Sequence, residues 1–311
     1  MDQLAALETS PSSAFEIPPF PWGDMPEEEY YRLKRVENRQ GYFRSSRGVN
    51  LFTQQWVPLD YPKPKALICM VHGYSNDISW TFQSTGILFT SMGYAAVAVD
   101  LQGHGRSDGL KGYLPDVDGA TQDCTDFFNS VSETEELSGI PTFLYGESLG
   151  GAICLLIHLQ EPKQWNGAIL AAAMCKISDN MRPPWPVQQI LMFLAYFLPT
   201  WAIVPNTNYL DKSMKDPVKR EMIRHNPQRY GGKPRLGTAV EMLRVTAVLE
   251  SRLQDVDLPM LIIHGTGDVV TDPAVSKALG EPDENVAILI EDITTWLKER
   301  VERWHSAHPM S

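Results

Sequence analysis

Short, continuous apolar runs recur along the chain, and several of them end in glycine. Runs of this kind are typical of strands buried on both faces, as in a parallel sheet. The runs are ALICMVHG, YAAVAVD, TFLYG, GAILAAA and MLIIHG. An earlier segment, LFTQQWVP, predicts one further strand near the N-terminus.

Segments with helical spacing of apolar positions lie between these runs. The pattern predicts helices over about residues 118–137, 149–159 and 238–253. Strands that alternate with helices in this order favour an α/β fold, with a mostly parallel sheet and helices on both of its faces.

Residues 175–237 interrupt this alternation. They contain eight prolines, two tryptophans and the apolar run ILMFLAYFLPTWAIV at 190–204. An insertion of this length between two strands usually covers a site, so we expect a cap or lid here. The core then comprises residues 26–174 and 238–311, and the Pro-, Ser- and acid-rich residues 1–25 form a loose tail. The apolar run is broken by Pro199 and is short for a membrane span. It indicates either a helix that packs in the core or lid, or a lid helix that contacts a membrane.

The charge balance excludes some partners. A net charge of −11 and a pI near 5.1 disfavour binding of nucleic acid and of anionic lipid, and suit a neutral small-molecule substrate.

The cysteines and the N-terminus indicate a cytoplasmic protein. The four cysteines form no CxxC pair, so we expect reduced thiols. The N-terminus lacks the basic and apolar regions of a secretory signal. No His, Cys or carboxylate group has metal-ligand spacing, and no cofactor is expected.

The segment TFLYGESLGGA carries the strongest chemical signal. Gly146 to Gly150 form a G-x-S-x-G motif that follows a predicted strand and opens a predicted helix. This is the setting of a nucleophile elbow, in which a tight turn exposes the serine hydroxyl above the sheet. We therefore predict that Ser148 is a nucleophile.

Two backbone N–H groups are predicted to stabilise an oxyanion beside Ser148. In folds with this elbow, one donor follows the nucleophile and the other lies in the loop after an earlier strand. Here the donors are the N–H groups of Leu149 and Tyr74. His72, just before this loop, is interpreted as a residue that shapes it. His72 and Asp77 also fit an H-x-x-x-x-D acyltransferase pattern, although the hydrolase context explains them better.

Two further glycine-rich loops follow buried strands. In VDLQGHGRSDG, His104 and Arg106 are expected to brace the loops around the site. In HGTGDVVTD, Asp268 fits the acid of a Ser–Asp–His triad, because the acid follows the serine along the chain in these hydrolases.

These residues resemble a known family. In order, the segments MPEEEYY, HGYSNDISWTFQ, GHGRSDG, GESLGG, MCKI, NPQRYGGKPRLGT, HGTGDVVTDP and GEPDEN are similar to the plant monoacylglycerol lipase and caffeoylshikimate esterase branch of the α/β-hydrolases. The resemblance extends over nearly the whole chain. It implies that Ser148 is the nucleophile, Asp268 the triad acid, Tyr74 and Leu149 the oxyanion donors, and residues 175–237 the cap over the acyl pocket.

The chain departs from this family after Leu279. Family members continue there with more helix, a strand and a loop that bears the catalytic histidine, whereas this chain runs directly into Gly280. About two dozen residues are absent by this comparison, including the last strand of the sheet. From residue 281 to about 303, apolar positions recur at helical spacing, which predicts one helix after the junction. A short helix is expected at 273–279, and no strand fits between the two.

No other histidine is expected to substitute. His72, His104 and His264 lie in glycine loops, and His158 lies about ten residues into the predicted helix, roughly 15 Å from its start. Two functions remain: a serine carboxylic-ester hydrolase impaired by loss of its histidine, or a non-catalytic α/β-hydrolase that binds a ligand or is the defective product of an altered transcript.

Overall fold

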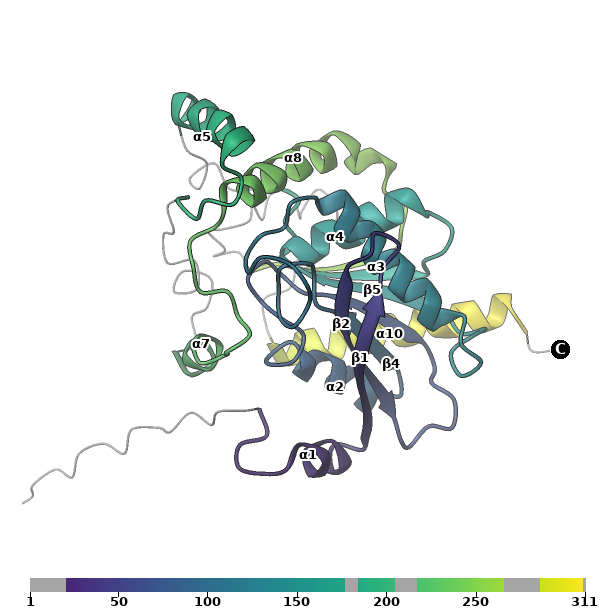
Figure 1. Cartoon of the computed structure of the whole chain (residues 1–311). Coiled ribbons are helices and arrows are strands. Elements are labelled where there is room, and N and C mark those ends of the chain that lie inside the picture. Colours follow the sequence, from purple (N-terminus) through teal and green to yellow (C-terminus); the bar gives the residue numbers. More distant parts are fainter. Residues whose placement is uncertain (1–20, 177–183, 205–216, 266–285, 310–311) are drawn as a thin grey trace, which may run out of the picture.

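The computed structural model describes residues 21–176, 184–204, 217–265 and 286–309, and these contain one twisted sheet (Figure 1). Its strand order is β1-β2-β4-β3-β5-β6-β7. β1 and β2 pair antiparallel, as do β2 and β4, and all other neighbours are parallel, so the predicted mostly parallel sheet is confirmed. The strands are β1 (Val36–Arg44), β2 (Asn50–Pro58), β3 (Leu67–Val71), β4 (Ala95–Val99), β5 (Thr142–Glu147), β6 (Gly167–Ala171) and β7 (Met260–Ile263).

Helices cover both faces of the sheet, as the alternation predicts. On β3, Leu67, Cys69 and Val71 face one core, whereas Ile68 and Met70 face the other, because successive side chains of a strand point to opposite sides. The first core is closed by α3 (Val117–Ser132), α4 (Leu149–Gln160) and α8 (Leu236–Arg252), and the second by α2 (Gln83–Ser91) and α10 (Val286–Ala307). The remaining described helices are α1 (Glu27–Leu33), α5 (Trp185–Phe197), α7 (Pro217–Arg224) and the 3₁₀ turn η2 (Leu253–Asp255).

The C-terminal helix packs on the sheet through one apolar stripe. Ile293, Leu297 and Val301 recur every four residues and are buried against the second core. This agrees with the predicted helix, although α10 continues to Ala307. The junction Leu279–Gly280 and the short helix expected at 273–279 lie outside the described residues.

β7 is the last strand of the sheet in the described part of the chain. It pairs with β6 through the register Ile169↔Leu261. Of its four residues only Ile262 is fully buried, whereas all five residues of β3 are. The C-terminal border of the sheet is therefore less covered than its centre.

Part of the predicted cap is described, at 175–176, 184–204 and 217–237. α5 lies at one end of α8, away from the sheet, and α7 lies on the same side of the molecule (Figure 1). Within the described ranges, no helix is both long enough and apolar enough to cross a bilayer. Most of the expected tail, residues 1–20, falls outside those ranges.

Candidate active site

Ser148 occupies a strained turn between β5 and α4. Its φ of 51° and ψ of −116° lie in a backbone region that residues other than glycine rarely adopt. The turn is fixed on both sides, because Ser148 N–H donates to Ala171 O at 3.0 Å and Met174 N–H donates to Ser148 O at 2.9 Å. The sequence motif therefore forms the strand–turn–helix that a nucleophile elbow requires.

The glycines of the motif are needed because backbone approaches them closely. A Cβ on Gly146 would lie 2.5 Å from Gly150 O, and a Cβ on Gly150 would lie 2.0 Å from Val71 O. Both distances are far below van der Waals contact. The elbow is thus packed directly against the end of β3, where the predicted oxyanion loop begins.

The loop after β3 passes beside Ser148. A Cβ on Gly73 would lie 3.3 Å from the Ser148 Cβ, and Tyr74 is the next residue of this loop. Leu149 is the first residue of α4, and its N–H has no acceptor within that helix. The fold therefore brings the start of this loop, at Gly73, against the turn of Ser148 and Leu149.

His72 holds this loop by using both ring nitrogens. Its Nδ1 donates to Gly73 O at 2.7 Å, and its Nε2 accepts from Leu101 N–H at 3.0 Å. Burial lowers the pKa of His72, which keeps the ring neutral as this pattern requires. Asp77 instead accepts hydrogen bonds from the Ser79 N–H at 2.8 Å and from the Ser79 hydroxyl at 2.6 Å. His72 and Asp77, the two residues of the acyltransferase pattern, are therefore not hydrogen-bonded to the same groups.

His104 packs against the neighbouring loop as expected, whereas the Arg106 side chain contacts residues of β1 and β2. The His104 ring lies 5.5 Å from His72 and 5.3 Å from Tyr74, centroid to centroid. Burial and then the adjacent His72 lower the pKa of His104 to about 3, so it is a neutral packing group at physiological pH. The Arg106 guanidinium covers the Phe52 ring at 4.5 Å.

A buried carboxylate, which the sequence indicated only as the end of a strand, joins the two loops. Asp100 accepts from Ile78 N–H at 2.9 Å and from Arg106 N–H at 2.8 Å. Burial, and secondly the charge of Asp77, raises the pKa of Asp100 to about 7. Gly105 must be glycine here, because a Cβ would lie 1.9 Å from Asp100 Oδ2.

All seven histidines lie in the described part of the chain, and the rings of five of them contact groups other than the Ser148 hydroxyl. His158 lies near the far end of α4, with Nε2 3.1 Å from Asp257 Oδ1. His225 contacts Glu221 O at 2.9 Å, and the His308 ring stacks on Trp304 at 4.6 Å. The predicted triad acid, Asp268, lies outside the described residues.

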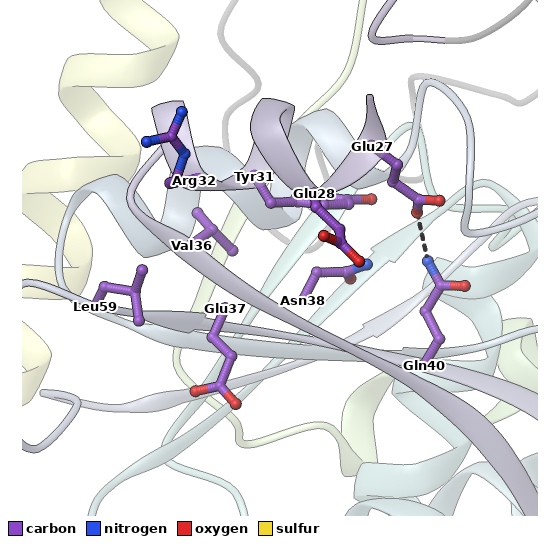
Figure 2. A pocket seen from close by; sticks show the side chains of 9 residues that line it. All are labelled: Glu27, Glu28, Tyr31, Arg32, Val36, Glu37, Asn38, Gln40 and Leu59. Atoms are coloured by element: carbon purple, nitrogen blue, oxygen red, sulfur yellow. Dashed lines mark hydrogen bonds between the residues drawn. The ribbon is translucent and has the colours of Figure 1, made fainter. Parts of the chain in front are cut away.

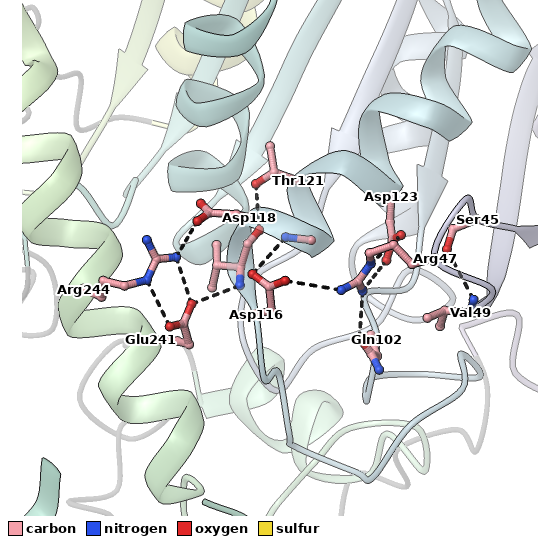
Figure 3. A network of polar contacts seen from close by, with 12 residues as sticks. Ser45, Arg47, Val49, Gln102, Asp116, Asp118, Thr121, Asp123, Glu241 and Arg244 are labelled. Carbon is pink, nitrogen blue, oxygen red and sulfur yellow. Dashed lines mark hydrogen bonds and ion pairs between the residues drawn. The ribbon is translucent and has the colours of Figure 1, made fainter. Parts of the chain in front are cut away.

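Polar contacts fasten α3 to α8 (Figure 3). Arg47 pairs with Asp123 at 2.7 Å and donates to Gln102 Oε1 at 2.8 Å, in the loop after β4. Glu241 of α8 accepts from the first N–H of α3, Val117, at 3.2 Å, and also binds Arg244 at 2.9 Å. This network holds the cap-bearing helix against the core.

A cavity of about 450 Å³ lies elsewhere, between α1 and β1 (Figure 2). None of the predicted site residues lines it. Three of its side chains are glutamates, and one of them, Glu27, accepts from Gln40 Nε2 at 2.9 Å. We assign no function to this cavity.

A family of serine hydrolases matches most of the chain. The sequence model described as serine aminopeptidase, S33, matches residues 62–284. The chain belongs to this family. Among curated relatives, this S33 hydrolase is 39% identical to caffeoylshikimate esterase of Arabidopsis thaliana over 309 residues, with 92% of each chain covered. It is 25% identical to human monoglyceride lipase over 247 residues, covering 78% of this chain and 75% of that one.

Solved structures support the same fold for this S33 hydrolase. A soluble variant of monoglyceride lipase from Saccharomyces cerevisiae, in complex with a substrate analog, superposes with a TM-score of 0.70 at 20% identity, covering 85% of this chain and 96% of the other. A thermostable carboxyl esterase from Bacillus coagulans gives a TM-score of 0.68 at 17% identity, covering 85% and 99%. The α/β-hydrolase fold is confirmed, and the chain is a member of a carboxylic-ester hydrolase family.

Proposed function

We propose that this chain is a serine carboxylic-ester hydrolase of the monoacylglycerol lipase type, which lacks its catalytic histidine. The observation that supports the ester chemistry is the strained turn of Ser148 beside the loop of Gly73 and Tyr74. In an intact site, the Ser148 oxygen attacks the acyl carbonyl while a histidine, oriented by Asp268, takes its proton. The N–H groups of Tyr74 and Leu149 stabilise the oxyanion.

The rest of the reaction follows from this geometry. The histidine returns the proton to the leaving alcohol as its bond to the acyl carbon breaks, and an acyl-Ser148 ester remains. Water, activated by the same histidine, then releases the acid. Monoacylglycerols, lysophospholipids and caffeoyl-type esters are the proposed substrates, because relatives are named for a caffeoyl ester and for monoglycerides.

Three observations support loss of the histidine-bearing segment. In the described part of the chain, the rings of five histidines contact groups other than the Ser148 hydroxyl: His72, His104, His158, His225 and His308. β7 is a half-covered border strand there. The alignment with the caffeoylshikimate esterase is 309 residues long, yet 92% of this 311-residue chain is about 286 residues, so about 23 aligned positions have no counterpart here. That is the length of the segment proposed to be missing after Leu279.

The same observations favour a second candidate function. Without the histidine, the pocket can bind an ester without efficient turnover, as a binding protein or as the product of an altered transcript. Loss of the triad base costs about 10⁶-fold in turnover, and the oxyanion hole and binding still leave roughly 10³ to 10⁴ over water. The transcript sequence across Leu279–Gly280 distinguishes an altered transcript from a chain that is encoded in this form.

Ser148→Ala tests the nucleophile. In a chain that carries the histidine segment, this variant should lose ester hydrolysis and covalent labelling by a serine-directed fluorophosphonate. The exposed Ser306→Ala is the matched control, since its hydroxyl only donates to Glu302 O at 2.9 Å, and it should label like the parent. Labelling that persists in Ser148→Ala would place the nucleophile elsewhere. A panel of monoacylglycerol, lysophospholipid and caffeoyl esters then identifies the substrate.

The cap carries a surface suited to lipid. α5 contains no charged residue among its thirteen, and most of its apolar side chains are exposed. Trp185, Phe193 and Tyr196 are 73%, 66% and 83% exposed. Tryptophan and tyrosine suit the interface between headgroups and acyl chains. We propose that this face touches a neutral membrane, from which a monoacylglycerol would be taken.

Substitution of the three α5 aromatics tests membrane contact. Burial of about 100 Å² per ring corresponds to about 2.5 kcal/mol, so the triple serine variant should bind phosphatidylcholine vesicles at least tenfold more weakly. Flotation with vesicles measures this. Tyr42→Ser, at an exposed position of β1, should bind like the parent chain. Equal flotation of the triple variant and the parent would exclude α5 as the contact.

A further inference from the structure

A buried hydrogen bond joins the cap to the loop beside Ser148. Asn226 follows α7 in the cap and is 6% exposed, and its Nδ2 donates to Oδ2 of Asp77, which is fully buried. The Asn226 Oδ1 accepts from Gln228 N–H at 2.9 Å, so both ends of the amide are used. The two bonded residues are 149 positions apart in the chain.

Two more hydrogen bonds run alongside this one. Tyr230 N–H donates to Ser75 O at 3.1 Å, and Trp80 Nε1 donates to Met222 O at 3.1 Å. The rings of Tyr74 and Tyr230 lie 6.5 Å apart. We name residues 222–230 the cap strap and residues 74–80 the oxyanion loop. The strap thus follows the loop over its whole length.

Asn226 is the one donor that the strap supplies to the Asp77 carboxylate among the described residues. The Oδ1 of Asp77 is occupied by Ser79, and the Oδ2 is bound by Asn226. A buried carboxylate oxygen that loses its donor is costly, so the loop has to rearrange if the strap moves away.

We propose that Asn226 is a positioning residue, which couples the position of the cap to the placement of the Tyr74 N–H beside Ser148. The inference rests on the proposed function, because it assigns the loop an oxyanion role. With the strap docked, the loop is held in the geometry that serves the reaction. With the strap displaced, the donor moves, and catalysis falls although Ser148 is unchanged.

Asn226→Asp separates the hydrogen bond from packing, because it is isosteric and keeps the acceptor for Gln228 N–H. The introduced carboxylate, when ionised, cannot donate and repels Asp77, whereas its protonated form can donate as Asn226 does. The other titratable groups that interact with Asp77 are Asp100 and His72, and both are present in the parent chain. Each measurement is therefore compared with the parent at the same pH.

Hydrogen exchange on the chain as it exists tests the coupling. At neutral pH, Asn226→Asp should speed exchange at least tenfold in residues 74–80 relative to the parent. The difference should shrink as the pH falls and the introduced carboxylate becomes protonated, which a purely steric role would not produce. Asn166→Asp is the matched control, since its Oδ1 only accepts from Thr142 N–H at 2.8 Å, and it should leave the loop unchanged.

A second variant covers the case in which Asn226→Asp does not fold. Trp80→Phe keeps a ring but removes the donor to Met222 O, and it should speed exchange in both the loop and the strap. Unchanged exchange in residues 74–80 of both variants, or an Asn226→Asp difference that does not respond to pH, would overturn the inference.

Kinetics then connect the loop to catalysis. In the chain with the histidine segment, Asn226→Asp should lower kcat by about 10- to 100-fold at neutral pH with little change in KM, because a displaced oxyanion donor acts on the transition state. A change in KM alone would contradict a positioning role. If the parent with the segment hydrolyses no ester, the proposed function fails, and the exchange result still decides whether strap and loop are coupled.

Discussion

Insertion of the family's strand-and-histidine segment between Leu279 and Gly280 should raise ester turnover by about 10⁶-fold, which corresponds to roughly 8 kcal/mol of transition-state stabilisation. The reason is that the turn of Ser148 and the loop of Gly73 already lie side by side, and on the proposed function the segment supplies the missing base. The measurement is steady-state hydrolysis of a monoacylglycerol by the chain with and without the insertion.

The same insertion should also stabilise the fold. β7 is a half-covered border strand in the described part of the chain, and a further strand would pair with it. If that strand covers about 200 Å² of apolar surface, the gain is about 5 kcal/mol, comparable with the net stability of a domain. We expect the melting temperature to rise by roughly 10 °C or more, measured by thermal denaturation.

A control insertion separates catalysis from folding. The same segment with its histidine changed to alanine should raise the melting temperature as much as the intact segment, yet leave turnover at the level of the unmodified chain. If the unmodified chain already turns over at an ordinary enzyme rate of about 1 to 10³ per second, a surrogate histidine is present and the proposed loss is wrong.

The parallel strands could be predicted because each is a continuous apolar run buried on both faces. β1 was missed because its residues alternate between exposed and half-buried, and Val36 is its only fully buried residue. As a border strand it carries the polar residues that solvent permits, so it has no apolar run. The sequence predicts α5 only as part of an apolar lid run within an insertion, because its side chains are mostly exposed and show no core-facing stripe.

The elbow and its neighbours could be predicted because their signals are local. Gly146, Ser148 and Gly150 are close in the chain, so the motif can be recognised without knowledge of the distant residues that also hold the turn. Asn226 and Asp77 could not be paired from sequence, since a contact between a loop and a distant insertion leaves no spacing to detect. The oxyanion roles of Tyr74 and Leu149 and the triad role of Asp268 remain predictions.

Gly150→Ala should destabilise the protein by about 4 kcal/mol or more, enough to prevent a marginally stable chain from folding. Gly150 lies in the first turn of α4, where alanine would ordinarily stabilise a helix by up to about 1 kcal/mol. The sign is reversed here because the new Cβ would lie 2.0 Å from Val71 O and 2.8 Å from His72 O. Both atoms belong to the backbone at the end of β3, which cannot retreat without breaking the sheet.

Gly41→Ala is the matched control for this substitution. Gly41 lies in β1, has no positive φ, and a Cβ there would meet nothing within 4 Å, so the free energy of unfolding of this variant should stay within about 1 kcal/mol of the parent. Urea denaturation of both variants measures the difference. A Gly150→Ala chain as stable as Gly41→Ala would mean that the elbow does not press against β3. In that case the close approach of Gly73 to Ser148, on which the oxyanion assignment depends, would also be wrong.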